Sequence, residues 1–591
     1  MKRNTYCGTV RATQIGESFT VCGWVQRQRD LGSLIFIDLR DRTGILQLAF
    51  DESTKQEIFD LAFTCRSEFV LEASGVLRER SAKNTDIPTG EVELEVHSLK
   101  ILAQSETPPF EILEHSNANE TLRLKHRYLD LRRPDLQRNI MLRHRVSKIT
   151  RDYFDENGFI EIETPMLIRS TPEGARDFLV PSRLKPGTFY ALPQSPQLYK
   201  QLSMVAGFDR YIQIARCFRD EDLRADRQPE FTQIDLEMSF VDRDDVLSMV
   251  EGYIARVFKE ILDKDIALPL PRMSFQQAME EYGTDKPDLR YEMKIFDASP
   301  VVASAEFAVF SGAIAAGGSV RGIVAKNAVE TLSRKEIDKL VAFIRGVGGK
   351  GIAWARLGAD GMTSSFAKFL TDTEMESLLQ AANAQTGDVV LLIADEQNSA
   401  VLSQLGLLRV EVAKRLSLAD PNEHIPFWIL DFPYFEKDEE TGEFMPMHHA
   451  FTAPMDECLD YLESDKENVR AKAYDLVLNG IELASGSIRI TDTHIQQRIF
   501  DLLGLTPEES QRKFGFLLDA FRYGPPPHGG MALGLDRLVM QLLGAESLRD
   551  VLAFPKLKDA SEAMTNCPDT VENEHLEELG IQLQEIKKTE E

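Results

Sequence analysis

Two carboxylates lie close to Asn479-Gly480, a residue pair that strongly favours a two-residue β-hairpin turn. That turn pairs Val477 with Glu482 and leaves Asp475 as a diagonal neighbour of Glu482 on the same face, roughly 7 Å away. Two carboxylates at this distance can share one hard cation, such as the Mg²⁺ that accompanies a nucleotide. Two surface acids flanking a turn are the alternative interpretation.

Two cations lie on predicted helices. Arg537 follows Gly534 in the first turn of a helix whose apolar residues recur at the helical period, so it and the free amides of that turn could bind phosphate. Lys200 lies on a helix predicted to have Ser195 as its N-cap, on the same face as Gln197. A solvated surface side chain is the alternative interpretation of both Arg537 and Lys200.

Two predicted strands, 211–219 and 231–240, flank the charged loop 220–229. Alternate residues of a strand point to the same face. The polar residues on one face of the second strand are Gln233, Asp235 and Glu237. Such a face is either solvated, as in an outer hairpin, or part of a binding site, and the arginines of the loop favour a binding site.

The composition describes an acidic, globular chain of several domains. It has 591 residues, of which 68 are Lys or Arg and 95 are Asp or Glu, giving a net charge of −27. At roughly 150 residues per domain, this length predicts three or four domains. A long uncharged run, 307–320, is shorter than the roughly 18 to 20 apolar residues that a bilayer requires. We therefore expect no membrane span.

The N-terminal residues and the cysteines favour a cytoplasmic location. Met1–Thr5 leads into polar sequence instead of the apolar core of a signal peptide. The six cysteines form no pair at metal-ligand or redox spacing. A reducing, cytoplasmic environment is the resulting prediction.

Positive charge is concentrated in one part of this acidic chain. Residues 121–151 contain ten Lys or Arg residues against only Asp130 and Asp135. Association with nucleic acid is steered by local potential and not by the total charge. The tract is therefore either a nucleic-acid contact or a solvated helix face.

The order of elements predicts a barrel followed by a larger, interrupted domain. Residues 1–103 contain five expected strands, with a helix at 51–65 after the third, which is the order of a small oligonucleotide-binding barrel. The expected strands are 18–28, 33–40, 44–50, 68–78 and 91–101. Residues 104–120 are expected to form a linker. Helices alternate with strands both in 121–286 and in 419–591, so these two segments are predicted to belong to one domain. Residues 287–418 are therefore predicted to be an inserted α/β domain.

Three motifs together resemble those of class II aminoacyl-tRNA synthetases, and specifically of the bacterial-type aspartyl-tRNA synthetases. Gly158–Pro165 resembles the first motif, which forms the dimer interface in this family. Phe218–Glu221 with Phe231 resembles the second motif, and Gly534–Arg537 resembles the third. The His-x-Gly-His signature of class I is absent. The resemblance implies an antiparallel-sheet catalytic domain at 121–286 and 419–591, with a C-terminal extension.

The resemblance further implies ATP-dependent ligation of L-aspartate to tRNA(Asp) through aspartyl-adenylate, with release of AMP and diphosphate. Its catalytic residues would be Arg219, Glu221 and Arg537. ATP would contact Arg219, Asp220, Glu221, Gln228, Phe231, Glu482, Gly534, Leu535, Asp536 and Arg537. Mg²⁺ would bind Asp475 and Glu482. The residues that would contact aspartate are Glu173, Gln197, Lys200, Arg219, Asp235, His448 and Arg489. Lys200 and Arg489 would bind its side-chain carboxylate. His449 would also close over the site.

For the barrel, the resemblance implies that the anticodon lies on the strand face. The implied contacts are Arg29, Phe36, Gln47, Arg78 and Glu93, with a base stacked on Phe36. Family members that also charge tRNA(Asn) often carry His at the position of Leu31, so this chain is predicted to be specific for tRNA(Asp). Burial of Phe36 in the barrel core is the alternative interpretation.

Other functions are compatible with parts of this pattern. A synthetase for asparagine or lysine shares the scaffold, but neither an amide nor an ammonium favours two cations such as Lys200 and Arg489. An enzyme that charges both tRNA(Asp) and tRNA(Asn), and a non-catalytic tRNA-binding paralogue, are further alternatives. The predicted partners are tRNA(Asp), L-aspartate and a second copy of the chain, with neither DNA nor a membrane.

Overall fold

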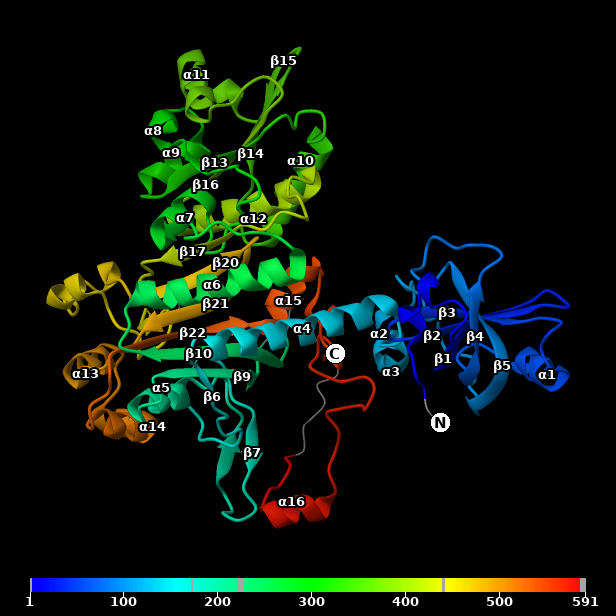
Figure 1. The fold of residues 1–591 in the computed structure, drawn as a ribbon. Helices are drawn as coiled ribbons and strands as arrows, with labels where there is room; N and C mark the ends of the chain where they lie inside the picture. The colour runs from blue at the N-terminus through cyan, green and yellow to red at the C-terminus, as the bar shows by residue number, and fades with distance from the viewer. Residues whose placement is uncertain (1–2, 172–173, 222–226, 438–441, 585–591) are drawn as a thin grey trace. The chain divides into compact units, whose positions relative to one another are not determined.

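The computed structural model describes residues 3–171, 174–221, 227–437 and 442–584 (Figure 1). The chain divides into two compact units. One unit contains residues up to Arg145 together with Ser547–Val571, and the other contains nearly all of the remaining chain. No helix among the described residues has the length and apolarity needed to cross a membrane.

The first unit contains a closed five-stranded barrel with the strand order β1-β2-β3-β5-β4. Its elements are β1 (Ser18–Asp30), β2 (Ile35–Asp41), β3 (Gly44–Phe50), α1 (Gln56–Thr64), β4 (Val70–Glu79) and β5 (Val92–Ala103). Alternate apolar residues, such as Val21, Ile37 and Leu48, are fully buried and fill the interior. The predicted five-stranded barrel with a helix after the third strand is confirmed.

The basic tract forms helices whose charges are mostly paired. The helices are α2 (Glu120–Lys125), α3 (Arg127–Asp130) and α4 (Pro134–Glu156). Arg127 is buried against Asp130 and donates to three backbone carbonyls of residues 549–553. Arg132 pairs with Glu68 at 2.8 Å, and Arg138 pairs with Glu114. Much of the local positive charge is therefore compensated by acids that lie elsewhere in the sequence.

The second unit is built on an eight-stranded sheet with the order β11-β17-β20-β21-β22-β10-β9-β6. Its strands are β6 (Ile160–Glu161), β9 (Arg210–Phe218), β10 (Glu230–Ser239), β11 (Arg272–Ser274), β17 (Pro426–Leu430), β20 (Ala473–Leu478), β21 (Ile481–Ile488) and β22 (His528–Gly534). All neighbours are antiparallel except β11 with β17 and β6 with β9. This confirms the predicted antiparallel sheet of a class II catalytic domain.

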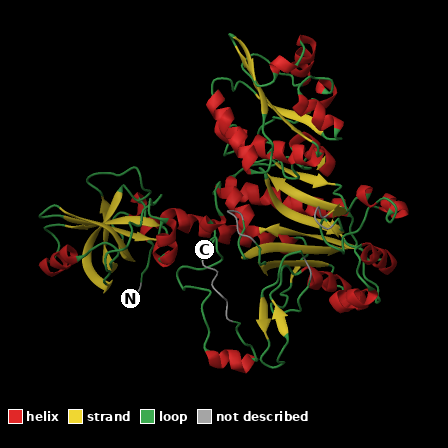
Figure 2. Ribbon diagram, turned by 180° about the vertical axis from the view of Figure 1, so that it is seen from behind, coloured by secondary structure: helices red, strands yellow, loops and turns green. Residues whose placement is uncertain are grey.

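Helices and short hairpins surround this sheet. The helices are α5 (Gln197–Val205), α6 (Arg243–Leu262), α7 (Phe275–Tyr282), α13 (Thr493–Leu502), α14 (Pro507–Phe521), α15 (Leu535–Leu543) and α16 (Asn573–Leu579). The hairpins are β7 (Leu179–Pro181) with β8 (Phe189–Ala191), and β18 (Phe435–Lys437) with β19 (Phe444–Pro446). Helix α6 lies across one face (Figure 1), whereas the view from behind shows central strands without a helix in front of them (Figure 2).

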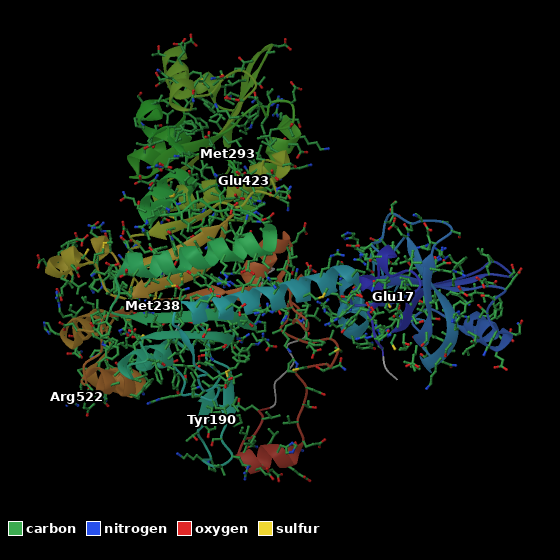
Figure 3. The ribbon with its side chains drawn as sticks, viewed as in Figure 1. Glu17, Tyr190, Met238, Met293, Glu423 and Arg522 are labelled. Atoms are coloured by element: carbon green, nitrogen blue, oxygen red, sulfur yellow. The ribbon has the colours of Figure 1, made fainter. Side chains whose placement is uncertain are left out.

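The segment predicted as an insertion has a five-stranded sheet of its own, with the order β12-β13-β16-β14-β15. Its elements are β12 (Phe296–Asp297), α8 (Ser299–Val302), α9 (Ala308–Ala315), β13 (Ser319–Ala325), α10 (Arg334–Gly346), β14 (Ala353–Gly358), β15 (Gly361–Ser364), α11 (Asp372–Ala381), β16 (Val389–Asp395) and α12 (Asn398–Leu416). Met293 and Glu423 mark its two connections in Figure 3. These connections lie side by side, since Arg290 Nη1 donates to the Asp420 carbonyl at 3.2 Å.

Candidate active site

Four buried, charged side chains meet on the polar face of β10. Lys200 donates to Asp235 Oδ1 at 3.0 Å and lies 3.4 Å from Glu237 Oε2. Arg489 binds the same Glu237 carboxylate through Nε and Nη2, at 2.9 and 3.1 Å. Each of the four is at most 4% exposed. The interpretation of Lys200 as a solvated surface cation is therefore wrong, and the two cations converge on one carboxylate.

The sheet register brings these side chains together. Asp235 and Glu237 share a face of β10, and Glu237 pairs with Gly530 of β22. A Cβ at position 530 would lie 1.9 Å from Glu237 Oε2, so only glycine leaves room for this carboxylate. Arg489 directly follows β21, and α5 supplies Lys200.

The start of α5 differs by one residue from the prediction. The helix begins at Gln197 with Pro196 at its N-cap, instead of Ser195 at the N-cap and Pro196 as the first helical residue. Ser195 Oγ still accepts from the Gln197 backbone N–H at 3.3 Å, so the hydroxyl supports the first turn from outside the helix.

The environment separates the roles of the two carboxylates. Burial opposes the charge of Glu237, but Arg489 and Lys200 outweigh it and lower the pKa of Glu237 to about 2. Burial raises the pKa of Asp235, although Lys200 acts against this shift. Burial and the nearby Arg489 hold the pKa of His449 well below its ordinary value. Glu237 is therefore the stable counterion of the two cations, and His449 is neutral.

Several buried polar atoms of this unit have no hydrogen-bond partner among the described residues. Those on predicted site residues are Gln197 Nε2, Arg219 Nε, Asp235 Oδ2, His448 Nδ1 and Asp475 Oδ1. Buried polar atoms are normally paired, and leaving one unpaired costs roughly 1–3 kcal/mol. These atoms therefore mark positions where a ligand could supply the missing partners.

Residues of the second motif lie where β9 and β10 enter their connecting loop. The Arg219 guanidinium lies over the Phe231 ring, 5.1 Å from its centroid. Glu221 pairs with Arg227 at 3.2 Å. The structure places Asp220 near the start of this loop and the buried Gln228 near its end. These residues bring a cation, an acid and an aromatic ring to one end of the two strands.

The predicted hairpin is confirmed around Asn479-Gly480, which both have positive φ, 50° and 83°. Val477 pairs with Glu482 as expected. Burial and the negative charge of Asp475 raise the pKa of Glu482, which shows that the two carboxylates interact. His448 Nε2 lies 3.6 Å from Asp475 Oδ1.

The carboxylate pair fits a nucleotide-bound Mg²⁺ better than a metal held by protein alone. Among the described residues, no group of three or more His, Cys, Asp or Glu side chains could hold a metal ion. Mg²⁺ commonly uses one or two carboxylates and completes its shell with phosphates and water. Asp475, with its unpartnered buried Oδ1, and the adjacent Glu482 provide such a pair.

The third motif contributes one cation and one structural contact. Arg537 Nη1 donates to the Glu482 carbonyl at 3.0 Å, which places the guanidinium beside the carboxylate pair. Asp536 is buried, and its Oδ2 accepts from the Thr232 backbone N–H at 3.0 Å. It therefore joins α15 to β10. Gly534 and the buried Leu535 form the junction between β22 and α15.

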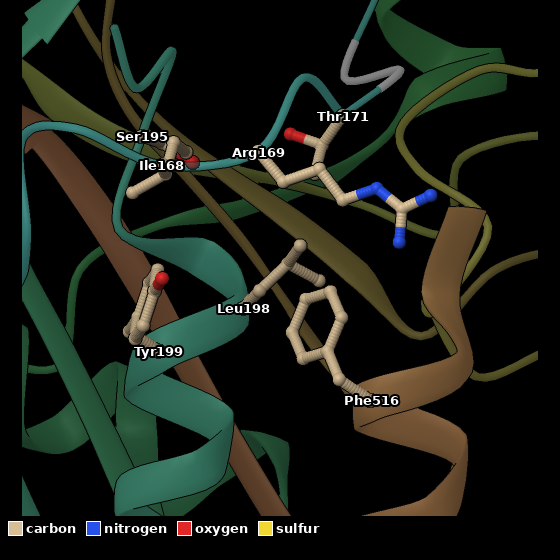
Figure 4. A pocket seen from close by; sticks show the side chains of 7 residues that line it. All are labelled: Ile168, Arg169, Thr171, Ser195, Leu198, Tyr199 and Phe516. Atoms are coloured by element: carbon tan, nitrogen blue, oxygen red, sulfur yellow. The ribbon is translucent and has the colours of Figure 1, made fainter. Parts of the chain in front are cut away.

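A pocket of about 110 Å³ lies beside α5 (Figure 4). It is lined by Thr171 and Ser195, by Leu198 and Tyr199 of α5, and by Phe516 of α14. Glu173, predicted to contact aspartate, follows this stretch but lies outside the described residues.

The five residues predicted to bind the anticodon share one face of the barrel. Arg29 Nη2 donates to Gln47 Oε1 at 2.8 Å, Gln47 Nε2 donates to Glu93 Oε2 at 2.6 Å, and Arg78 Nε donates to Glu93 Oε1 at 2.9 Å. The Arg29 guanidinium lies 5.7 Å from the Phe36 ring. The two arginine side chains are about one-third exposed, at 36% and 32%, whereas Gln47 and Glu93 are buried. Arg29, Phe36 and Arg78 therefore lie above a buried amide–carboxylate pair.

Sequence reasoning missed two residues of these networks. The sequence pattern indicates Glu237 only as part of a polar face and does not indicate that Lys200 and Arg489 share it. Arg80, which donates to Gln47, is the second such residue. The period of two gave a usable signal for both, because Glu237 lies two residues from Asp235 and Arg80 lies two residues from Arg78.

The low pKa of Glu237 predicts a pH-dependent contribution to stability. Because its folded pKa of about 2 lies below the ordinary glutamate value of 4.5, the contribution is full above pH 4.5 and is lost as the pH falls through 2. It amounts to about 3 kcal/mol at pH 7 and decreases by about 2 kcal/mol at pH 3. In urea unfolding, the stability difference between the parent and Glu237→Gln should shrink by this amount. A difference that does not change between pH 7 and pH 3 would contradict the assignment.

Comparison with protein families identifies both parts of the chain. Residues 119–558 match the model for class II tRNA synthetases (D, K and N), and residues 19–102 match the OB-fold nucleic acid binding domain. The aspartate–tRNA ligase of Ruminiclostridium cellulolyticum is 55% identical over 99% of this chain and 98% of its own length. That of Clostridium perfringens is 53% identical over 100% of this chain and 98% of its own length.

Solved structures share the fold. A putative aspartyl-tRNA synthetase from Leishmania major matches with a TM-score of 0.59 and 20% identity, covering 94% of this chain and 93% of that one. An asparaginyl-tRNA synthetase from Pyrococcus horikoshii matches with a TM-score of 0.56 and 18% identity, covering 94% and 98%.

The fold and the family match show that the chain is a class II tRNA synthetase of the D, K and N group. Within that group it belongs to the aspartate–tRNA ligases, enzymes that attach aspartate to tRNA. The resemblance described from the sequence motifs is thereby confirmed.

Proposed function

We propose that the buried charge cluster binds L-aspartate and that the adjoining second and third motifs bind ATP, so that the chain forms aspartyl-adenylate and transfers the aspartyl group to tRNA(Asp). The observation that carries this proposal is the convergence of Lys200 and Arg489 on Glu237. With Asp235 facing the substrate ammonium, the two cations against the single low-pKa carboxylate of Glu237 leave a positive charge for the side-chain carboxylate of aspartate.

Aspartate fits this cluster in one orientation. Its side-chain carboxylate lies against Lys200 and Arg489, and its ammonium donates to Asp235 Oδ2, which has no partner in the part of the chain that the structure describes. Gln197 Nε2, also unpartnered, donates to an oxygen of the amino acid. His448 and Glu173 complete the aspartate contacts. Each proposed contact pairs a charge or a hydrogen-bonding group with its complement.

The nucleotide lies over the second and third motifs. Arg219 holds the α-phosphate, adenine stacks on Phe231, and Arg537 holds the terminal phosphates. Glu221 and Gln228 fix the base and the ribose. Asp475 and Glu482 hold Mg²⁺, which neutralises phosphate charge when it is bound. The contacts of Asp220, Gly534, Leu535 and Asp536 are expected to be made chiefly through the backbone or to support their neighbours.

Activation is an in-line attack of the aspartate α-carboxylate on the α-phosphate, with diphosphate as the leaving group. This step needs alignment and neutralisation of charge more than a protein base. The aspartyl group then passes to a ribose hydroxyl at the tRNA terminus, and AMP leaves.

The proposed function is tested by ATP–pyrophosphate exchange with aspartate, asparagine and lysine. Two charge-assisted contacts, at roughly 1.5–3 kcal/mol each, favour aspartate over asparagine by about 10² to 10⁴-fold. Lysine is excluded because its ammonium would face Lys200 and Arg489. Exchange with asparagine within tenfold of that with aspartate would contradict the proposal.

We further propose that the barrel face around Phe36 binds the anticodon. Stacking of a base on an aromatic ring contributes about 1–3 kcal/mol, so Phe36→Ala should lower kcat/KM for tRNA(Asp) by about 5- to 150-fold. Pyrophosphate exchange, which needs no tRNA, serves as the reference activity. An unchanged kcat/KM for tRNA(Asp) would exclude stacking on this ring.

Leu31 supports specificity for tRNA(Asp). It lies in the turn between β1 and β2 and is 66% exposed, so it is accessible to a bound nucleic acid. Because the Leu31 side chain has no hydrogen-bonding group, it can contact a base only by van der Waals packing. Charging of purified tRNA(Asn) at a rate comparable to that of tRNA(Asp) would show that the enzyme serves both tRNAs.

We also propose a cytoplasmic homodimer, with the first motif at its interface. This motif contains β6, an edge strand of the large sheet whose Ile160 is 47% exposed. Edge strands with unpaired backbone groups are common sites of association. A monomeric mass in solution at micromolar concentration would contradict this assembly.

A further inference from the structure

One arginine of the barrel network lies outside the residues assigned above. Arg80 follows β4, and its Nη2 donates to Gln47 Oε1 at 2.7 Å. Arg29 Nη2 donates to the same oxygen at 2.8 Å, so both lone pairs of this carbonyl are used. Gln47 Nε2 donates to Glu93 at 2.6 Å. These three contacts fix the orientation of the buried Gln47 amide.

The two arginines that share Gln47 Oε1 differ in exposure. The Arg29 side chain is 36% exposed, whereas Arg80 is 9% exposed and its backbone N–H is bonded to the Glu91 carbonyl at 2.9 Å. Among the described residues, the buried Nε–H of each has no partner, so neither guanidinium is fully satisfied. Arg29 Nη2 also pairs with Asp38 Oδ1 at 3.0 Å, but this more exposed side chain is the one of the two that a bound base or phosphate can reach.

We propose that Arg80 is a positioning residue for tRNA recognition, which keeps the Gln47 carbonyl hydrogen-bonded while Arg29 turns to the anticodon. This inference rests on the proposed function, in which this face of the barrel binds the anticodon. Arg80 itself does not contact the RNA.

The physical reason is the cost of an unpaired buried acceptor. With Arg80 present, the departure of Arg29 leaves Gln47 Oε1 with one donor. Without Arg80, the same movement leaves this oxygen with none, and the lost contact weakens the tRNA-bound state by about 5- to 150-fold. Arg29 is then held in the position that it has in the free protein.

The test is aminoacylation of tRNA(Asp) by Arg80→Met, with kcat and KM measured separately. KM for tRNA should rise at least fivefold, with little change in kcat. Arg66→Met is the matched control, because Arg66 is exposed on the same unit and donates only to nearby carbonyls of Phe63 and Cys65. It removes the same charge and should change KM by less than about twofold.

Two further measurements separate positioning from a general effect of charge or stability. In a Gln47→Met background, Arg80→Met should cause no further rise in KM, because no carbonyl remains to be held. An acceptor minihelix without an anticodon arm should be charged equally well by the parent and by Arg80→Met. A further rise in KM in the Gln47→Met background, or slower charging of the minihelix, would overturn the inference.

The outcomes also distinguish this inference from the proposed function. If Phe36→Ala and Gln47→Met raise KM but Arg80→Met does not, only the role of Arg80 fails. If none of the three changes KM, the barrel face is not the anticodon site.

Thermal unfolding checks that Arg80→Met folds. If it does not, Arg80→Lys is the second variant. It keeps the charge, but its side chain is one bond shorter and ends short of the position of Nη2, so KM should rise as in Arg80→Met; a KM equal to that of the parent would overturn the inference.

Discussion

Replacement of Arg489 by leucine should reduce aspartate-dependent pyrophosphate exchange by about 10- to 150-fold. The change removes the guanidinium proposed to bind the substrate side chain, and charge-assisted contacts of this kind contribute roughly 1.5–3 kcal/mol each. The measurement is exchange at saturating ATP over a range of aspartate concentrations. Exchange that stays within tenfold of the parent would show that the assignment of Arg489 is wrong.

Arg489 also contributes to stability, so the loss of activity must be separated from a loss of folding. Arg489 makes two hydrogen bonds to Glu237, which is fully buried. Removing one partner of a buried ion pair commonly costs about 3–5 kcal/mol, because the other charge is left uncompensated. Arg489→Leu is therefore expected to be less stable as well as inactive.

The double variant Arg489→Leu/Glu237→Gln separates these two effects. It removes the uncompensated carboxylate, so its free energy of unfolding should return toward that of the parent. Exchange should remain low, because the cation that binds aspartate is still missing. Recovery of exchange together with stability would show that Arg489 acts only through the fold.

Replacement of Arg219 by methionine should lower kcat for pyrophosphate exchange by about 10² to 10³-fold, as expected for loss of a group that stabilises developing charge. Its guanidinium lies over Phe231, and its buried Nε has no partner among the residues that the structure describes. This geometry leaves an N–H for a phosphate oxygen. The decrease should be in kcat more than in KM for aspartate, because Arg219 is proposed to act on the α-phosphate.

Arg216→Met is the matched control for Arg219→Met. Arg216 lies on β9, and alternation directs it away from the face that carries Gln213. It pairs with Glu230 at 2.6 Å and is 40% exposed, so its loss should alter exchange by less than about threefold. If Arg219→Met lowers kcat no more than Arg216→Met does, Arg219 is not a catalytic residue.

Local sequence patterns predicted most of the elements that carry the site. The Asn479-Gly480 turn, in which both residues adopt positive φ, set the pairing of Val477 with Glu482. A register shift between Leu476 and Val477, which the pattern did not predict, then pairs Asp475 with Ser485. Alternation placed Asp235 and Glu237 on one face, and the barrel strands were predicted to within about two residues. These features depend on neighbouring residues, so a single sequence shows them.

Burial and pairing of charge could not be predicted in the same way. Lys200 lies on an ordinary-looking helix and gave no sign that it would be buried against Asp235, 35 residues away. Glu237 and Arg489 are 252 residues apart. The positive charge of residues 121–151 is also smaller in the fold than the sequence of this tract alone indicates, because Arg132 is paired with Glu68 of the barrel.

The order of elements, the three motifs and hence the family can be predicted from the sequence alone, because each depends on short-range periodicity or on the types of adjacent residues. Which charges contact each other depends on the tertiary structure. In the folded chain, Lys200 and Arg489 both pair with Glu237, and two arginines donate to the Gln47 carbonyl oxygen. Electrostatic and hydrogen-bond energies depend on distance in space and on exclusion of water, neither of which separation along the chain specifies.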